Sequence, residues 1–179
     1  MIHIITPYRE DKDLGKAYNR ACELIPDGDW ICLMDIDAMF LTPDAPAMMQ
    51  RYVDLYPQTG VFTCLTNRVS HLAFEQLYEG HPSSEDSILV HIGIATRQRN
   101  LLPQSTIIRR GEISGYLILF SKETWQQNKF DEGIGCLAVD TFWSRRIIQM
   151  GKDIRRMDAI YIWHTYRLWK DIKDKEHLK

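Results

Sequence analysis

The chain has 179 residues, of which 45% are hydrophobic and 26% charged, and its net charge is −2. This is the length of one domain, and the composition is that of an ordinary globular protein, which argues against a disordered or fibrous chain. A general nucleic-acid-binding protein carries an excess of basic residues, so we expect no nucleic-acid partner.

Neither the start nor the interior of the chain predicts a membrane segment. Its first residues lack the basic flank and long apolar run of a signal peptide, and the longest apolar stretch, residues 31–41, contains two aspartates. The four cysteines are too widely spaced for a metal motif and are typical of reduced thiols. We therefore expect a cytoplasmic protein without a transmembrane segment. The sequence leaves peripheral membrane contact and the oligomeric state open.

Short apolar runs alternate with amphipathic segments, a pattern that predicts an α/β fold. We expect strands at residues 2–6, 30–34, 61–65, 115–120 and 160–163, and the first two of them are expected to be buried. Helices are expected at residues 14–25, 43–56, 122–128 and 139–150, and a solvated helix at residues 170–179. Residues 66–110 show weak periodicity, which indicates one or two helices and a polar loop. No repeat or linker divides the chain, so residues 1–179 are predicted to form a single domain.

The most informative motif is Asp35-Ile36-Asp37, which directly follows the predicted buried strand at residues 30–34. In open α/β sheets, ligands bind beyond the carboxyl ends of the strands. Carboxylate oxygens are the ligands that Mg²⁺ and Mn²⁺ prefer. The motif therefore predicts a site for a divalent cation that bridges a diphosphate, with a pair of exposed turn aspartates as the alternative.

Four stretches of the chain, taken in order, resemble glycosyltransferases of family 2. They are residues 4–9 (Ile-Ile-Thr-Pro-Tyr-Arg), residues 17–37 with the Asn-Arg helix and the Asp-x-Asp strand, residues 114–122, and a closing block within residues 130–164. The resemblance covers residues 2–167. It implies a GT-A (nucleotide-diphospho-sugar transferase) fold, a Rossmann-like, mostly parallel sheet flanked by helices in a compact single domain.

The resemblance also implies a role for each matching residue. The nucleotide sugar would be bound by Thr6, Pro7, Tyr8, Arg9, Asn19, Asp35 and Asp37. The metal, Mn²⁺ or Mg²⁺, would be held by Asp35, Asp37 and His164. Asp140 would be the catalytic base that deprotonates the acceptor hydroxyl, and the acceptor side would include Gly115 and Glu132. Arg9 or Arg145 would contact the phosphates.

Several of these residues also have a purely structural interpretation. Asp140 stands where a helix N-cap is expected, and His164 lies in an aromatic cluster with Tyr161, Trp163 and Tyr166. Asn19 would then hydrogen-bond backbone, and Gly115 would mark a bulge. Asp131 and Glu132 are alternative candidates for the base.

One feature departs from the family pattern. The family usually has a second strand whose aspartate reads the nucleotide base, whereas here Pro7 leads almost directly to Asp13. Base recognition is left to Glu10, Asp11 or Asp13, and the donor nucleotide stays open.

The sequence thus predicts a metal-dependent glycosyltransferase that moves a sugar from a nucleotide-sugar donor to a hydroxyl acceptor such as a glycan or polysaccharide. The family resemblance implies that the enzyme is of the inverting type. The alternative is a degenerate domain that binds a nucleotide or a partner without turnover. A haloacid-dehalogenase-like phosphatase is disfavoured, because Met39 stands where that class has Thr or Val. A nucleotidyltransferase is disfavoured because the segment after Pro7 contains only Gly15 of the glycine-rich loop that it needs.

Overall fold

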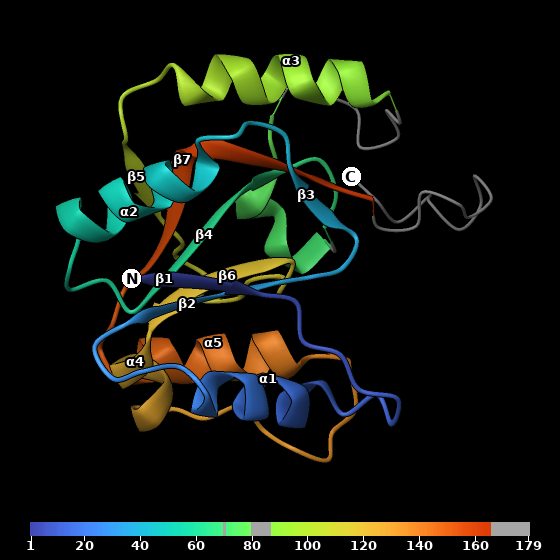
Figure 1. Cartoon of the computed structure of the whole chain (residues 1–179), viewed down its shortest axis with the longest axis vertical. Helices are drawn as coiled ribbons and strands as arrows, with labels where there is room; N and C mark the ends of the chain where they lie inside the picture. Colours follow the sequence, from blue (N-terminus) through green and yellow to red (C-terminus); the bar gives the residue numbers. More distant parts are fainter. Residues whose placement is uncertain (70, 80–86, 166–179) are drawn as a thin grey trace.

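The computed structural model describes residues 1–69, 71–79 and 87–165 (Figure 1). A single sheet lies between two groups of helices. Its strands are β1 (Ile2–Ile5), β2 (Trp30–Met34), β3 (Ala38–Phe40), β4 (Val61–Thr66), β5 (Ser105–Ile107), β6 (Leu117–Ser121) and β7 (Ile154–His164). The predicted helix at residues 170–179 lies outside the described residues.

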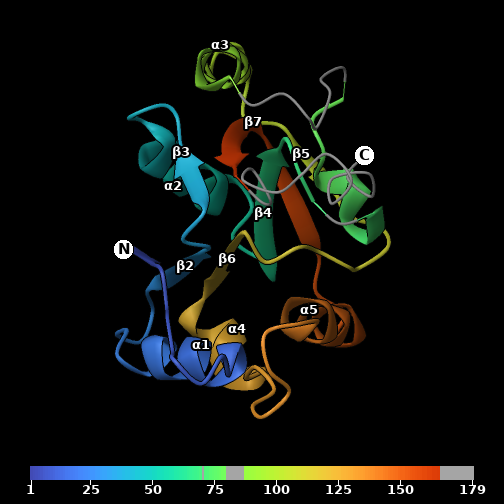
Figure 2. The same ribbon diagram turned by 90° about the vertical axis from the view of Figure 1, so that its right-hand side faces the viewer.

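The strand order is β1-β2-β6-β4-β7-β3, and β5 pairs with β7 as well. Only β1–β2 and β4–β7 are parallel, whereas β2–β6, β4–β6, β3–β7 and β5–β7 are antiparallel. The prediction of a mostly parallel, Rossmann-like sheet of the GT-A type is therefore wrong. The sheet is mixed, because β6 enters between β2 and β4 in the opposite direction, and it curls into a half-barrel (Figure 2).

The long strand β7 contributes to this curvature. Cys64 of β4 lies opposite Met157, but the next residue, Leu65, lies opposite Tyr161. Such an irregularity bends a strand and increases its twist. The first part of β7 accordingly pairs with β5 and its last three residues pair with β3. The bend brings the end of β7 next to the turn that follows β2.

Helices cover both faces of the sheet (Figure 1). On one side lie α1 (Leu14–Glu23), α4 (Lys122–Gln127) and α5 (Val139–Gln149); on the other lie α2 (Ala45–Leu55) and α3 (Ile88–Arg99), and a short 3₁₀ segment, η1, spans His71–Gln76. Alternate residues of a strand face opposite sides of a sheet. In β6, Leu119 accordingly packs with Tyr52 of α2, and Phe120 packs with Tyr18 of α1 and Trp143 of α5.

Most predicted elements on the described residues have counterparts in the structure, but three points differ. The first strand was expected to be buried, yet β1 is an edge strand paired only with β2, and Ile4 is 40% exposed. The short strands β3 and β5 were not predicted, and β7 begins at Ile154 rather than near residue 160. Among the described residues, no helix has the length and apolarity needed to cross a membrane.

Candidate functional site

Asp35 and Asp37 lie in the turn between β2 and β3. The backbone N–H of Asp35 donates to the carbonyl of Tyr116 (3.1 Å), which extends the β2–β6 ladder by one step. The N–H of Ala38 donates to the carbonyl of Asp35 (3.1 Å) and closes the turn. The carbonyl of Asp37 accepts a hydrogen bond from the backbone N–H of Thr165 (2.8 Å). The positions of both aspartates are thus set by the ends of three strands.

His164 is the last residue of β7 and lies opposite Ala38 in the β3–β7 ladder. Its side chain is 5% exposed, and Nδ1 lies 2.8 Å from the carbonyl oxygen of Arg68. A carbonyl only accepts hydrogen bonds, so Nδ1 must carry the proton, and in the neutral ring the lone pair is on Nε2. Nε2 is the atom that faces Asp37, 3.4 Å from its Oδ1. A backbone carbonyl that fixes the tautomer in this way is typical of metal-binding histidines.

Asp35, Asp37 and His164 form a cluster whose ligand atoms all lie within 4.8 Å of one another. The set offers two carboxylate oxygens and one imidazole nitrogen. Carboxylates suit Mg²⁺ and Mn²⁺, and imidazole favours a transition metal, so this donor set fits Mn²⁺ well. The aromatic-packing interpretation of His164 is compatible with this arrangement, since its ring lies 5.3 Å from that of Tyr116. Tyr166, also expected in that cluster, lies outside the described residues.

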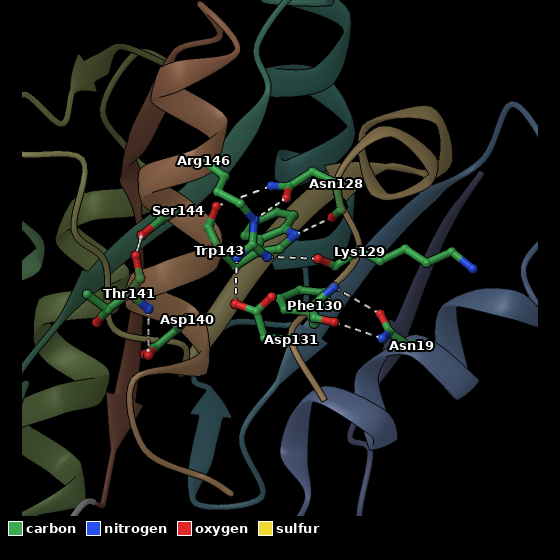
Figure 3. A network of polar contacts seen from close by, with 10 residues as sticks. All are labelled: Asn19, Asn128, Lys129, Phe130, Asp131, Asp140, Thr141, Trp143, Ser144 and Arg146. Carbon is green, nitrogen blue, oxygen red and sulfur yellow. Dashed lines mark hydrogen bonds and ion pairs between the residues drawn. The ribbon is translucent and has the colours of Figure 1, made fainter. Parts of the chain in front are cut away.

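The cluster opens into a cavity of about 360 Å³ that Asp140 also lines. Both oxygens of Asp140 accept backbone hydrogen bonds. Oδ2 accepts from Gly115 (2.6 Å). Oδ1 accepts from Thr141 (2.8 Å), as Figure 3 shows. The N-cap of α5 is Ala138, in the left-handed conformation with φ 63°, so the N-cap interpretation of Asp140 is wrong. Asp140 instead lies in the first helical turn, where the helix dipole favours a negative charge.

Gly115 is the backbone position against which Asp140 packs. A Cβ added to Gly115 would lie 3.2 Å from both Cβ and Oδ2 of Asp140. A glycine there lets the carboxylate approach the chain closely. This close approach explains why residue 115 is a glycine, so neither a bulge nor a direct contact with an acceptor is needed to explain it.

The carboxyl groups around the cavity perturb one another. Burial, opposed by the charge of His164 and aided by the charges of Asp37 and Asp140, raises the pKa of Asp35 to about 6. Burial also raises the pKa of Asp140, against the hydrogen bonds from Thr141 and Gly115. Burial acts in the same direction on Asp37, but the hydrogen bond and charge of His164 outweigh it and lower the pKa of that carboxyl. Strongly perturbed groups that converge on one cavity are typical of functional sites.

The raised pKa of Asp35 predicts that this residue destabilises the metal-free protein. Its folded-state pKa is about 6 against an ordinary 3.8, so ionisation costs stability progressively as the pH rises between these values. Asp35→Asn should therefore stabilise the metal-free protein by about 1–2 kcal/mol at neutral pH, allowing for partial solvent access. Chemical denaturation at several pH values tests this. The gain should vanish below the ordinary pKa, and an equal gain at low pH would contradict the electrostatic cause.

The predicted nucleotide-binding segment lines a second cavity of about 170 Å³. Pro7, Tyr8 and Arg9 are three of its walls, and Lys12 and Cys136 are two more. The side chain of Tyr8 is 78% exposed, and Thr6 is exposed beside this cavity but does not line it. Cys136 also lines the larger cavity, so the two cavities adjoin there.

Acidic residues near the second cavity were expected to read the base, and most have structural partners. Arg9 makes two hydrogen bonds to Asp11, with Nε 2.9 Å from Oδ1. Asp13 is the N-cap of α1, accepts from the backbone N–H of Lys16 (3.1 Å), and is one of the cavity walls. Glu10 is exposed. Of these three acidic residues, Asp13 is the one that lines the cavity.

Asn19, predicted to contact the nucleotide, is instead part of a buried network (Figure 3). Its amide nitrogen donates to the carbonyl of Phe130 (3.0 Å) and to Glu132 (2.8 Å). Its oxygen accepts from the backbone N–H of Phe130 and from the indole of Trp125, both at 3.0 Å. The amide is 5% exposed and fully engaged in tying α1 to the loop before α5.

Two acidic residues of the loop before α5 lie outside the larger cavity. Asp131 pairs with Arg146 (2.5 Å), and the exposed Glu132 is held by Asn19. Neither residue lines the larger cavity, so neither is placed to replace Asp140 as a base or to contact an acceptor there.

The larger cavity has one acidic wall that sequence reasoning missed. Glu112 lines it and forms an ion pair with Arg145 of α5 (2.5 Å). Arg145 was considered as a phosphate ligand, but it is engaged with this carboxylate. A lone glutamate between two turns carries no periodic signal, so only the fold reveals its position.

A comparison with models of known protein families finds no match for this chain, and no curated protein matches it either.

Proposed function

We propose that this protein is a metal-dependent glycosyltransferase that moves a sugar from a nucleotide-sugar donor to a hydroxyl acceptor. The observation that carries the proposal is the cluster of Asp35, Asp37 and His164 within 4.8 Å, on the same cavity as Asp140. These four residues come from the turn between β2 and β3, from the end of β7 and from α5, and they are the ones that the family resemblance assigns to the metal and the base.

The leaving group explains why such an enzyme uses a cation. A nucleoside diphosphate gains negative charge as the glycosidic bond breaks, and a divalent ion bound there stabilises that charge. Among the described residues, the larger cavity is lined by Asp35, Asp37, Glu112 and Asp140 and by no Lys or Arg. A diphosphate would be repelled from these carboxylates unless a cation accompanied it. Asp35, Asp37 and His164 are the residues that would hold this cation.

The second cavity suits the nucleotide end of the donor. Tyr8 offers an exposed aromatic ring on which a base can stack, and Lys12 brings positive charge to a region where Arg9 is paired with Asp11. Since the cavities adjoin at Cys136, a donor spanning both would place its base near Tyr8 and its sugar near Asp140. These charges therefore predict the orientation of the donor, with its base in the second cavity and its sugar in the larger one.

Asp140 is the candidate base for the acceptor hydroxyl. Its raised pKa makes it a stronger base than an ordinary aspartate, and its two backbone hydrogen bonds fix the carboxylate in place. Those same hydrogen bonds favour the second candidate function, a domain that binds a nucleotide without turnover, because both oxygens of Asp140 already have protein partners. Separate measurements of binding and turnover distinguish the two functions.

A thermal-shift panel of nucleoside diphosphates, each with and without Mn²⁺, tests the proposal. A ligand that binds only the folded state stabilises it by about 2.7 kcal/mol at a hundred times its dissociation constant. We expect stabilisation that requires both Mn²⁺ and one particular nucleotide, followed by transfer or hydrolysis of the matching nucleotide sugar. Binding without any turnover would favour the degenerate domain, and a panel without any shift would contradict both functions.

Cys136 provides an independent probe of the junction between the cavities. It is the exposed one of the four cysteines, and Cys22, Cys32 and Cys64 are buried. In the native protein we expect one fast-reacting thiol, and a bound donor with Mn²⁺ should slow its reaction with a thiol reagent at least about tenfold by covering it. Cys136→Ser identifies the reacting thiol. Unchanged reactivity at a nucleotide concentration that saturates the thermal shift would place the donor elsewhere.

A further inference from the structure

Strands β4 and β6 are joined near the larger cavity by side chains more than by a backbone ladder. The two strands share one registered pair, Phe62 with Leu119, and residues 114–116 lead from the cavity wall into β6. Backbone groups that are buried outside a ladder need other hydrogen-bond partners. At Ser114, a wall of the cavity, the buried amide of Gln76 supplies those partners.

Gln76 is the last residue of η1, and its side chain is fully buried. Its Oε1 accepts a hydrogen bond from the backbone N–H of Ser114 (2.7 Å), and its Nε2 donates to the carbonyl of the same residue (3.2 Å). Nε2 also donates to Oγ1 of Thr63 in β4 (2.6 Å). The amide thus bonds both backbone groups of Ser114, as a paired residue on an antiparallel strand would, and ties them to β4.

The chain after Gln76 is itself fixed to β4. Leu77 forms a parallel bridge with Thr66, and the N–H of Tyr78 donates to the carbonyl of Thr66 (2.9 Å). The backbone of Gln76 therefore adjoins a segment that is paired with the sheet. A side chain that is anchored in this way can hold a neighbouring segment in one geometry.

The bond between Gly115 and Asp140 is the first contact beyond Ser114. The N–H of Gly115 donates to Oδ2 of Asp140 (2.6 Å). This N–H and the carbonyl of Ser114 belong to the same peptide unit, which is planar. Because Gln76 donates to that carbonyl, it also sets the direction in which the N–H on the other side of the peptide unit points.

We propose that Gln76 is a positioning residue that aims the N–H of Gly115 at the carboxylate of Asp140. Gln76 lines neither cavity, so it acts through the peptide unit and not by touching a substrate. A hydrogen bond to a charged acceptor is about twice as strong as a neutral one, so its loss would free one oxygen of the carboxylate. The effect of Gln76 on turnover rests on the proposed function, whereas its effect on Gly115 does not.

Hydrogen exchange of the Gly115 amide in the metal-free protein tests this role without any substrate. The chain has 10 glycines, so selective labelling with ¹⁵N-glycine gives a simple spectrum, in which Gly115→Ala identifies the resonance. Gln76→Met keeps the length of the side chain but removes its hydrogen bonds, so the Gly115 amide should exchange at least about tenfold faster. Gln76→Asn, a milder change that keeps an amide on a shorter side chain, should also accelerate exchange.

Turnover provides the second readout. In Gln76→Met we expect kcat for sugar transfer to fall about 10- to 100-fold, because a misplaced base loses its alignment with the acceptor hydroxyl. The KM for the donor and the affinity for Mn²⁺ should stay unchanged, since Gln76 touches none of the three clustered metal-ligand candidates.

Tyr52→Phe is the matched control. Tyr52 is also fully buried, and its hydroxyl likewise bonds one backbone N–H, that of Ala159 (2.9 Å), and one carbonyl, that of Gln104 (2.8 Å). It lines neither cavity, so Tyr52→Phe should lower the thermal stability while it leaves the exchange of Gly115 and kcat unchanged.

Three results would overturn the role of Gln76. They are unchanged Gly115 exchange in folded Gln76→Met and Gln76→Asn, equal acceleration in Tyr52→Phe, and unchanged kcat of Gln76→Met in an enzyme whose unaltered form transfers sugar. If the unaltered protein transfers no sugar but the Gln76 variants accelerate exchange, the positioning of Gly115 stands and only the proposed function fails.

Discussion

Replacing Asp37 with asparagine is expected to abolish the joint binding of Mn²⁺ and nucleotide. The side chain of Asp37 is 39% exposed towards the cavity, and Oδ1 lies 3.4 Å from Nε2 of His164. Asparagine keeps the shape but removes the negative charge that a hard cation needs. We expect the affinity for Mn²⁺ in the presence of a nucleoside diphosphate to fall at least about 100-fold, since even supporting residues of metal sites contribute 10–100-fold. Isothermal titration calorimetry measures this loss.

The matched control for this variant is Asp54→Asn. Asp54 is an exposed aspartate of α2 that accepts a hydrogen bond from Gln50 and lies outside both cavities. The Asp54→Asn variant should bind Mn²⁺ and nucleotide as the unaltered protein does. If Asp37→Asn retained the same affinity while folding normally, the three-residue cluster would not be the metal site.

Replacing Asp140 with asparagine is expected to abolish turnover while donor binding persists. Asp140 lines the larger cavity but is not one of the three clustered ligands, so Mn²⁺ and nucleotide should still bind. An amide accepts no proton at neutral pH, and loss of a general base lowers rates by about 10²–10⁴-fold. Single-turnover sugar transfer and calorimetric binding, measured on the same preparation, separate the two effects.

Gly115→Ala is the companion variant for Asp140. An added methyl group would lie 3.2 Å from the Asp140 carboxylate and should displace it, so turnover should fall while the aspartate itself is retained. Glu132→Gln, which alters a nearby acid outside the cavity, should leave turnover unchanged. Normal turnover in Asp140→Asn would show that another group accepts the proton, and Glu112 would then be the residue to test.

Local elements could largely be predicted from the sequence, because their signals are local. The apolar stripe that includes Tyr18 and Cys22 marks α1, and the apolar run from Trp30 to Met34 marks β2. The aspartates that follow β2 were likewise expected at a strand end, and they lie there. For these residues, hydrophobic periodicity and turn chemistry determine the local structure.

The arrangement of strands could not be predicted in the same way. The direction of a strand leaves no mark on its hydrophobic pattern, so the antiparallel insertion of β6 was missed and the sheet was expected to be mostly parallel. The three-residue strand β3 is too short for a periodic signal, yet its pairing with β7 brings Asp37 next to Thr165, 128 residues away. The proximity of Asp37 and His164 was expected only from the family resemblance, because it depends on this long-range pairing.

Polar residues show the same contrast between what local sequence signals predict and what only long-range packing determines. Asn19 was expected either to contact the nucleotide or to hydrogen-bond backbone, and the packing of the loop after Asn128 makes it a buried amide bonded to the backbone of Phe130. Glu112 and Cys136 had no distinguishing pattern, and the fold alone brings them to the cavity walls. Sequence motifs therefore identified the metal-ligand candidates better than they identified the surroundings of those candidates.

The position of a bound Mn²⁺ ion is the most direct test of the proposed metal site. Crystals grown with Mn²⁺ and the nucleoside diphosphate that gives the largest thermal shift would be measured at the manganese absorption edge. We predict one strong anomalous peak within bonding distance of a carboxylate oxygen of Asp37 and of Nε2 of His164, with the diphosphate on its open side. A peak bound to other residues, or bound nucleotide without any manganese at this cluster, would contradict the proposed metal site and the mechanism built on it.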